Sequence, residues 1–259
     1  MNNTIGFFGD SFCSERFNMH SISHRYTSYI SKLSDHYNAK VVNLGHGGSG
    51  VWDTLLNQLT PFIQTNTVPD ICVFVWTIPG RLFHRTVRRL NQADTLHPKI
   101  HTYKPLKYKV WNAAKEFYGH LYDWEKEELE HKATLRYIDQ CVLPTLPSTT
   151  KIIHLWTAGT TTEWSSEGSR PSNVTYPYSW STGVEIRPSL LGLSLFDNDI
   201  SILQVDRRVN HLDGNFKNEL VFQWIRDAIT NYETSRLYDY SSVVETLYNK
   251  FQEDNPLAI

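Results

Sequence analysis

Four short segments of the chain carry residue types whose chemistry is complementary. They are Gly9-Asp10-Ser11, Asn43-Leu-Gly-His-Gly-Gly48, Thr77 and Asn210-His211. A serine hydroxyl can attack a carbonyl carbon, and an imidazole can take its proton and return it to a leaving group. The N–H groups of a glycine-rich loop can hold the oxyanion that forms. Brought together, these segments would supply the set needed for acyl transfer.

Each segment follows a run of residues that predicts a β-strand, so one sheet would position all of them. Strands are predicted at 4–9, 40–43, 71–76, 151–156 and 200–205, and helices at 25–37, 51–63, 121–142, 217–232 and 241–252. This alternation indicates an open parallel α/β sheet, in which ligands bind outside the carboxyl ends of the strands. The predicted fold is a flavodoxin-like, three-layer α/β/α domain with a parallel five-stranded sheet, an insertion after strand three and a C-terminal helix.

The insertion is predicted from charge and from missing periodicity. Residues 81–115 show no clear period and contain nine Lys or Arg against one acidic residue, Asp94. We interpret them as an irregular basic segment whose charge is balanced by the acidic helix that follows. The expected organisation is a main domain at 1–235, with a basic and helical insertion at about 81–125, and a C-terminal helical extension at 236–259.

Three of the segments, taken in chain order, resemble a known family. Ile5-Gly-Phe-Phe-Gly-Asp-Ser11 resembles the first block of the SGNH, or GDSL-like, hydrolase superfamily of esterases, lipases and carbohydrate deacetylases. Asn43-Leu-Gly-His-Gly-Gly48 is similar to the second block, and Asn210-His211-Leu-Asp to the last. The resemblance spans nearly the whole chain. It implies that Ser11 is the nucleophile, that the N–H groups of Ser11 and Gly48 form the oxyanion hole, and that His211 is the general base.

The sequence departs from this family at two places. The third block normally supplies an asparagine, but the chain reads Trp76-Thr-Ile-Pro-Gly-Arg81 there. Thr77 is the nearest substitute by position, and Arg81 is an alternative charged donor. The acid that usually precedes the histidine by three residues is replaced by Arg208. We expect Asp206 to orient His211, with Asp213 or a backbone carbonyl as the alternatives.

Other residues near the predicted site have candidate roles in binding. Asp10, His46 and Arg81 are expected to contact substrate because they lie in or beside the three loops. The glycine-rich loop lacks the GxGxxG and GxxxxGK[ST] spacings, which argues against nucleotide binding. His20 and His24 share a helical spacing but have no nearby third ligand. The sequence therefore calls for no cofactor and no metal.

Composition limits the class of protein and of partner. The chain has 259 residues, 40% of them apolar, and a formal net charge of −2, so we expect a folded protein that binds no nucleic acid. The longest apolar run, Ile71 to Trp76, is too short to cross a bilayer, and no signal-peptide pattern is present. The expected location is cytoplasmic or virion-associated, with no membrane partner. The sequence does not fix the oligomeric state.

The function predicted from these features is that of a serine esterase acting on a small-molecule or glycan ester. The connection 160–198 contains Trp164, Tyr176, Tyr178 and Trp180, which would either pack this segment onto the body or stack on a sugar. The second possibility favours an O-acetylated carbohydrate. The alternative is a non-catalytic SGNH-like module that binds glycan or serves as a structural part of a virion. A further alternative is nucleic-acid binding through the basic insertion.

Overall fold

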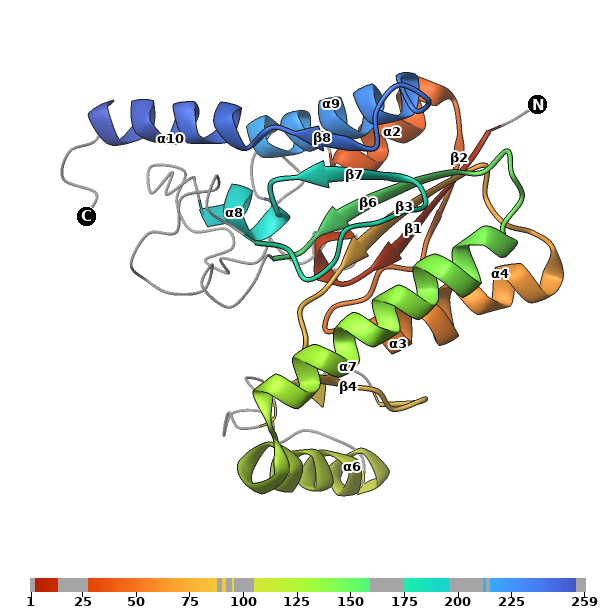
Figure 1. Cartoon of the computed structure of the whole chain (residues 1–259), viewed down its shortest axis with the longest axis vertical. Coiled ribbons are helices and arrows are strands. Elements are labelled where there is room, and N and C mark those ends of the chain that lie inside the picture. The colour runs from red at the N-terminus through yellow and green to blue at the C-terminus, as the bar shows by residue number, and fades with distance from the viewer. Residues whose placement is uncertain are drawn as a thin grey trace.

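The computed structural model describes residues 3–13, 28–87, 90–91, 95, 105–158, 175–195, 212 and 215–254 (Figure 1). The strands are β1 (Thr4–Gly9), β2 (Lys40–Asn43), β3 (Ile71–Trp76), β4 (Arg81–Leu82), β5 (Leu90–Asn91), β6 (Lys151–Trp156), β7 (Val184–Arg187) and β8 (Leu237–Asp239). The α-helices are α2 (Tyr29–Tyr37), α3 (Val51–Asp53), α4 (Thr60–Thr65), α6 (Pro105–Glu116), α7 (Trp124–Tyr137), α8 (Leu190–Leu195), α9 (Asn215–Thr230) and α10 (Ser241–Asp254). Shorter or wider helical segments are η1 (Ser11–Cys13), η2 (Thr54–Leu59), η3 (Phe117–Leu121), η4 (Ile138–Val142) and η5 (Leu143–Thr145).

The main sheet has six parallel strands in the order β2-β1-β3-β6-β7-β8. This order, which runs outward in both directions from β1 and β3, is that of flavodoxin-like α/β proteins. Gly9 pairs with Val75, and Trp76 pairs with Trp156, so β1, β3 and β6 end at nearly the same level. The residues that follow these three strands therefore lie along one edge of the sheet, where such folds bind their ligands.

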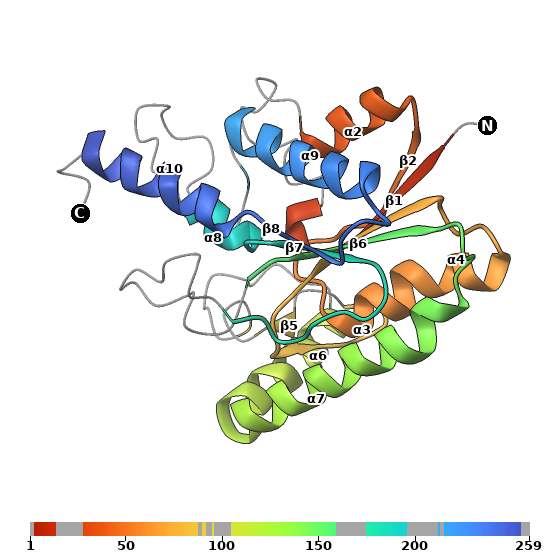
Figure 2. The same ribbon diagram turned by 45° about the horizontal axis from the view of Figure 1, so that its top comes forward.

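Helices cover both faces of the sheet (Figures 1 and 2). Side chains along each strand alternate between the two faces, so a hydrophobic core forms on each side. In β3, odd-numbered residues face α2 and α9, whereas even-numbered residues face α3, η2, α7 and η4. Every residue of β3 is buried. The predicted three-layer α/β/α architecture is confirmed.

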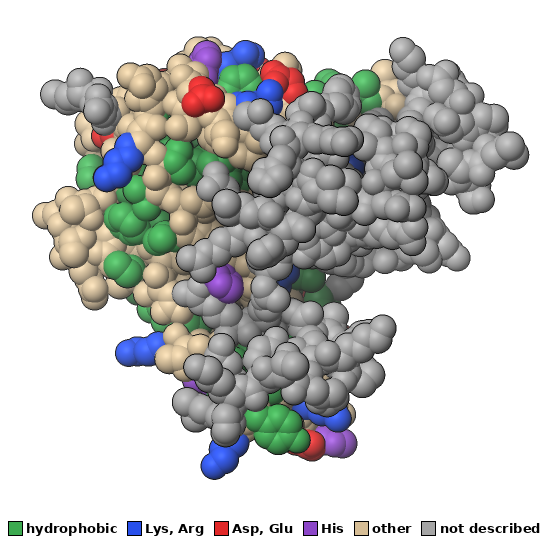
Figure 3. Space-filling view, turned by 180° about the vertical axis from the view of Figure 1, so that it is seen from behind, with side chains coloured by type: hydrophobic (Ala, Val, Ile, Leu, Met, Phe, Trp, Pro, Cys, Tyr) green, Lys and Arg blue, Asp and Glu red, His purple; other side chains and the backbone are tan. Residues whose placement is uncertain are grey.

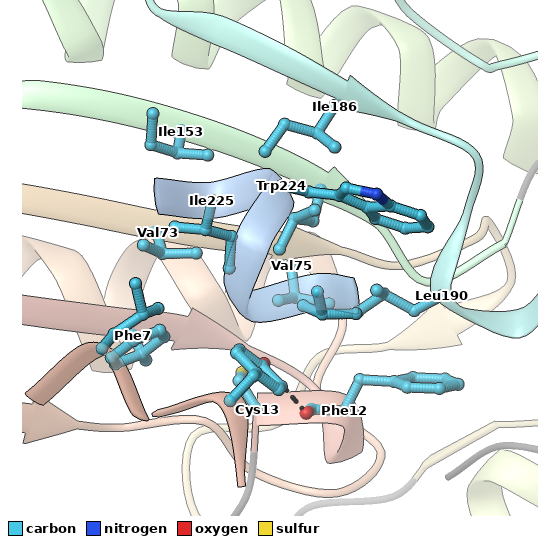
Figure 4. Packing of buried hydrophobic residues seen from close by; sticks show 14 of the residues in the cluster. Phe7, Phe12, Cys13, Val73, Val75, Ile153, Ile186, Leu190, Trp224 and Ile225 are labelled. Carbon is cyan, nitrogen blue, oxygen red and sulfur yellow. Dashed lines mark hydrogen bonds between the residues drawn. The ribbon is translucent and has the colours of Figure 1, made fainter. Parts of the chain in front are cut away.

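The core beneath α2 and α9 reaches the end of β1. Figure 4 shows Phe7, Val73 and Ile153 from neighbouring strands packed against Ile225 of α9. Phe12 and Cys13, which directly follow Ser11, belong to the same cluster. The hydrophobic core therefore anchors the turn that carries the predicted nucleophile.

Four predicted strands are confirmed as β1, β2, β3 and β6, but the sheet has six strands instead of five. The additional strands are β7 and β8, whereas the predicted strand at 200–205 lies outside the described residues. β7 was missed because Glu185 and Arg187 give it a polar pattern. Glu185 is buried, accepts hydrogen bonds from Arg187 Nε at 2.7 Å and Trp156 Nε1 at 3.2 Å, and so satisfies its charge inside the sheet.

The segment after β3 is more regular than its sequence indicated. β4 and β5 form an antiparallel pair, and α6 runs from Pro105 to Glu116, so the expectation of an irregular segment at 81–115 was wrong there. Trp111, Ala114 and Tyr118 recur at helical spacing and pack with Leu90 in a small separate core. The surrounding lysines masked this spacing. Figure 1 shows α6 set apart from the sheet, beyond α7.

The C-terminal part begins with β8, which pairs with β7, and continues as α10 on the same side of the sheet as α9 (Figure 2). On the face shown in Figure 3, acidic and basic side chains gather near the end of the molecule that α2 and α9 occupy. One pair there joins Lys32 to Glu219 at 2.7 Å. Within the described part of the chain, no helix combines the length and apolarity that a membrane span requires.

Candidate active site

The turn after β1 is shaped by a glycine and holds Ser11 at the sheet edge. Gly9 has φ 139°, and a Cβ at this position would overlap the carbonyl oxygen of Val75. Only glycine permits both this angle and this close approach. Asp10 is fully buried, whereas Ser11, which begins η1, is partly exposed. The predicted nucleophile is therefore accessible while its neighbour is enclosed.

The loop after β2 is fastened directly to this turn. Asn43 donates from Nδ2 to the carbonyl oxygen of Cys13 at 2.7 Å, and its Oδ1 accepts from Gly45 N at 3.0 Å. His46 N donates to Gly9 O at 3.0 Å. A Cβ on Gly45 would overlap Cys13 Sγ. The first two sequence blocks therefore lie against each other, as expected for segments that follow neighbouring strands of one parallel sheet.

Gly48 lies further along this loop with φ 81°, a backbone angle that favours glycine. The N–H groups of Ser11 and Gly48 thus belong to segments that are hydrogen-bonded to each other. Their role as oxyanion donors stays a prediction. His46 is partly buried, with Nδ1 3.1 Å from Gly47 O, and its contact with substrate also stays a prediction.

Asp10 is the central charged group of the site. Its Oδ1 accepts from Phe12 N at 3.1 Å, and its Oδ2 accepts from Thr157 Oγ1 at 2.8 Å and lies 3.5 Å from Arg81 Nη2. Burial raises the pKa of the Asp10 carboxyl, while the guanidinium of Arg81 opposes this rise. The carboxylate has partners inside the protein, and its predicted contact with substrate stays a prediction.

Arg81 and Thr77 occupy the position of the third sequence block. Arg81 Nη1 donates to the carbonyl oxygen of Ser49 at 2.9 Å, so this side chain is also engaged within the protein. Thr77 is buried, and its Oγ1 has no hydrogen-bond partner among the residues that the structure describes. Burying a hydroxyl without a hydrogen-bond partner costs free energy. Such unpartnered groups call for an explanation, and a role in function is one. Thr77 is therefore the better candidate for a third oxyanion donor.

Two further polar residues beside the site, Gln58 and His131, were not predicted from the sequence. Gln58 of η2 accepts from Gly9 N at 2.6 Å and donates to Gly9 O at 3.0 Å. Its side-chain amide thus makes the two backbone hydrogen bonds that a neighbouring strand would make. It also contacts Ser49 Oγ at 3.1 Å, and Ser49 donates to Asp53 Oδ2 at 2.6 Å. The signal was available in the sequence: Gln58 is a polar residue between Leu55 and Leu59 on an otherwise apolar helix face.

His131 of α7 is the other residue that sequence analysis missed. It is buried, and its Nε2 has no hydrogen-bond partner in the described part of the chain. Burial lowers the pKa of His131 to about 3, and the charge of Arg81 acts in the same direction, while the backbone of Thr77 acts against it. His131 is therefore a neutral imidazole beside Thr77. The surrounding run of glutamates hid it in the sequence.

Cys13 lies next to the predicted nucleophile but is not a competing one. Its Sγ donates to Asp10 O at 3.3 Å, and burial raises the pKa of the thiol well above its usual range. The thiolate that would be reactive is therefore disfavoured. Among the described residues, no group of three or more His, Cys, Asp or Glu side chains could hold a metal ion.

The predicted base and its orienting acid lie outside the described residues: His211, Asp206 and the alternative Asp213 are all in this category. The adjoining Leu212 is described. Asn218 Nδ2 donates to Leu212 O at 3.4 Å, and Asn218 Oδ1 accepts from Tyr29 N at 3.0 Å. Tyr29 Oη in turn donates to the carbonyl oxygen of Phe12 at 3.0 Å. Two side chains thus connect the neighbour of His211 to the neighbour of Ser11.

The described aromatic residues of the 160–198 connection pack onto the body. Trp180 stacks on His154 with ring centroids 4.0 Å apart and on Trp76 at 4.8 Å. Tyr178 donates to Asp139 Oδ2 at 2.9 Å, and Arg187 lies over the ring of Tyr176. Packing, the first of the two possibilities, accounts for these three rings. Trp164 lies outside the described residues.

Comparisons with known proteins give distant structural similarity. No protein-family model matches this chain, and no curated protein matches it. Among solved structures, it is similar to an acetyl xylan esterase, with 13% identity and a TM-score of 0.35 over 97% of this chain and 84% of that one. It is also similar to a protein of Parabacteroides merdae assigned as a GDSL-like lipase, with 12% identity and a TM-score of 0.29 over 99% of this chain and 96% of that one. At this level of similarity, the chemistry of the site rests on its own geometry.

Proposed function

We propose that this chain is a serine ester hydrolase that cleaves a small acyl ester through a covalent acyl-enzyme. Ser11 is the nucleophile, His211 is the general base, and the N–H groups of Ser11 and Gly48 bind the oxyanion. One observation carries the proposal: Asn43 and His46 tie the loop after β2 to the turn that holds Ser11. This contact puts the nucleophile and the candidate donors on adjoining segments.

The hydrogen bonds around Asn218 support the role of His211. They join Leu212, the next residue after His211, to Tyr29, and Tyr29 to Phe12, the next residue after Ser11. The start of α9 is thereby held on the side of the sheet where η1 lies. This link between the neighbours of the two residues supports His211 as the general base.

The proposed reaction has two halves. Ser11 Oγ attacks the ester carbonyl and forms a C–O bond, the carbonyl electron pair moves onto oxygen, and His211 takes the hydroxyl proton. The tetrahedral intermediate collapses, the bond to the alcohol breaks, and His211 returns the proton to the departing alcohol. Water then attacks the acyl-enzyme with His211 again as base. The products are a carboxylic acid and free Ser11.

Two neighbouring groups have proposed supporting roles. Thr77 Oγ1 donates to the oxyanion in place of the third-block asparagine, which is supported by its burial and by its lack of a hydrogen-bond partner among the described residues. Loss of one such donor typically costs about 10²- to 10³-fold in rate. Asp206 orients the His211 ring. An O-acetylated carbohydrate stays a proposed substrate, with Trp164 as the remaining ring that could stack on it.

The test is intact-mass spectrometry after exposure to a serine-directed fluorophosphonate, because this reagent needs an activated serine but no knowledge of the substrate. We expect one adduct per native chain, no adduct on Ser11→Ala and strongly slowed labelling of His211→Ala. Matched controls are Ser148→Ala and His120→Ala, which replace exposed residues far from the site in sequence. Both should be labelled like the native protein.

The same measurement can overturn the proposal. A native protein that takes no label, or an adduct that persists on Ser11→Ala, would show that Ser11 is not an activated nucleophile. Binding to a glycan array by an unlabelled native protein would then favour the non-catalytic, glycan-binding alternative. Where labelling follows the expected pattern, a screen of acetyl esters, including acetylated oligosaccharides, identifies the substrate.

A further inference from the structure

In the segment inserted after β3, one tyrosine contacts the backbone that carries Arg81. Tyr118 of η3 is buried in the small core of the insertion, and its hydroxyl lies 2.7 Å from both Gly80 O and Leu90 O. It also accepts from Leu82 N at 3.3 Å. Gly80 has φ 78°, and a Cβ there would lie 2.5 Å from Tyr122 Oη. Tyr118 therefore holds the backbone on both sides of Arg81, and Tyr122 lies against Gly80.

Arg81 is the residue that this backbone presents to the site. Its side chain is 14% exposed, whereas that of Asp10 is 1% exposed. Nη2 lies 3.5 Å from Asp10 Oδ2, and Nη1 donates to Ser49 O at 2.9 Å. Gly50 lies against the Arg81 backbone, where a Cβ would approach Arg81 Cβ to 3.1 Å. One guanidinium thus contacts the turn after β1 and the loop after β2 together.

Both contacts act on the proposed oxyanion donors. Asp10 also accepts from Phe12 N through Oδ1, so the orientation of its carboxylate sets the start of η1, where Ser11 lies. Ser49 directly follows Gly48. The hydrogen bond from Arg81 to the Ser49 carbonyl oxygen therefore fixes the position of the loop that carries the Gly48 N–H. A planar guanidinium can serve two acceptors at fixed separation, which the single ammonium of lysine cannot reproduce.

We propose that the inserted segment is a structural part of the catalytic centre, and that Arg81 is a positioning residue held by Tyr118 that sets the distance between the Ser11 turn and the Gly48 loop. This inference rests on the proposed function. It replaces the substrate-binding role expected for Arg81. A displacement of Tyr118 would then change the distance between the donors of the oxyanion hole.

The experiment separates positioning from substrate binding on the full-length chain. The steady-state kinetics of p-nitrophenyl acetate hydrolysis are measured for the native protein, Arg81→Gln, Arg81→Lys and Tyr118→Phe. We expect Arg81→Gln to lower kcat by about 10- to 100-fold with KM within about twofold, because a small misplacement of catalytic groups reduces the rate by this order. Arg81→Lys should recover only part of kcat. Tyr118→Phe, which keeps Arg81, should lower kcat by about 3- to 10-fold.

Controls match each substitution. Arg85→Gln removes an exposed arginine from the same segment, and Tyr108→Phe removes an exposed hydroxyl from α6. Both should behave like the native protein. Circular dichroism melting identifies any variant that fails to fold, and a folded Tyr118→Phe keeps the test valid if Arg81→Gln is unfolded.

The outcomes distinguish this inference from the proposed function. A raised KM with unchanged kcat in Arg81→Gln would show that Arg81 contacts substrate. Unchanged kinetics in folded Arg81→Gln or folded Tyr118→Phe, with a native protein that labels at Ser11, would overturn the inference alone. A native protein without fluorophosphonate labelling would overturn the proposed function and this inference with it.

Discussion

The contacts that join the loops after β1 and β2 to each other differ in kind from the contacts that join both loops to the segment after β3. Between the first two, a short amide contact from Asn43 and a backbone hydrogen bond from His46 fix the distance, and Gly45 leaves room for Cys13. The segment after β3 reaches both loops through the guanidinium of Arg81. Backbone contacts survive most side-chain substitutions. The first junction is therefore sensitive at Gly45 and at the Asn43 amide, and the second at one arginine.

The largest effect is expected from closing the space between the first two loops. In Gly45→Val, the new side chain would meet Cys13 Sγ and the Cys13 carbonyl, so the loop must move. We expect fluorophosphonate labelling of Ser11 to slow by about 100-fold or more. The matched control is Gly119→Val, since a Cβ at Gly119 has no neighbour within 4 Å. Native labelling of Gly45→Val would show that the junction does not set the site.

A second test removes the amide that supports the end of β1. Gln58→Leu leaves the N–H and carbonyl groups of Gly9 without their side-chain partner in a buried place. We expect the free energy of unfolding to fall by about 3 kcal/mol, measured by urea denaturation. Gln64→Leu, at an exposed position nearby, should change it by less than about 0.5 kcal/mol. Equal stability of the two variants would exclude a supporting role for Gln58.

The third test uses pH to examine the region beside Thr77. Burial lowers the pKa values of His131 and His154 to about 3, so between pH 3 and about 6.5 these histidines bind protons only when the chain unfolds. Their contribution to stability is complete above pH 6.5 and is lost as the pH falls. Each should cost about 2 kcal/mol between pH 7 and pH 5. His131→Gln should remove about half of the combined loss in urea titrations at the two pH values, whereas an unchanged pH dependence would contradict a buried neutral His131.

The smallest effect is a gain within the insertion. Gly119 lies in the helical segment η3 with open space around it, so alanine can replace it without a clash. We expect Gly119→Ala to raise the free energy of unfolding by about 0.5 to 1 kcal/mol, because alanine loses less backbone freedom on folding. Labelling of Ser11 should stay at the native rate. A slower rate would show that the site responds to changes in the insertion beyond Tyr118.

The elements that could be predicted are those whose burial matches their local pattern. The run Ile71–Trp76 is apolar at every residue because both faces of β3 are covered, and the helices over 51–63 and 217–232 show clear spacing. β7 could not be predicted, since Glu185 satisfies its charge with Arg187 and Trp156 only after the sheet has formed. The helix α6 was hidden by lysines around a narrow apolar stripe.

In the candidate site too, the residues that could be predicted are those with a local sequence pattern. Ser11 and Gly48 could be predicted as candidates because the loops that carry them follow clear strands and resemble known sequence blocks. Gln58 interrupts an apolar helix face, but its partner Gly9 is 49 residues away, so the local pattern marks the residue and not its role. His131 and the internal role of Arg81 left no local signature. Polar residues that work through tertiary contacts become visible only when the fold brings those partners together.

The rings of β3, β6 and Trp180 that pack on one face of the sheet give the protein an optical signature of its native packing. Trp76, Trp156, Trp180 and His154 hold fixed mutual orientations on one face of the sheet, and Trp76 Nε1 donates to His154 Nδ1 at 2.9 Å. Indoles fixed in such chiral surroundings give a near-ultraviolet dichroism that disappears when side chains become mobile, even if helices persist. A single spectrum therefore separates a variant whose site is altered in a native fold from one that has lost its tertiary structure.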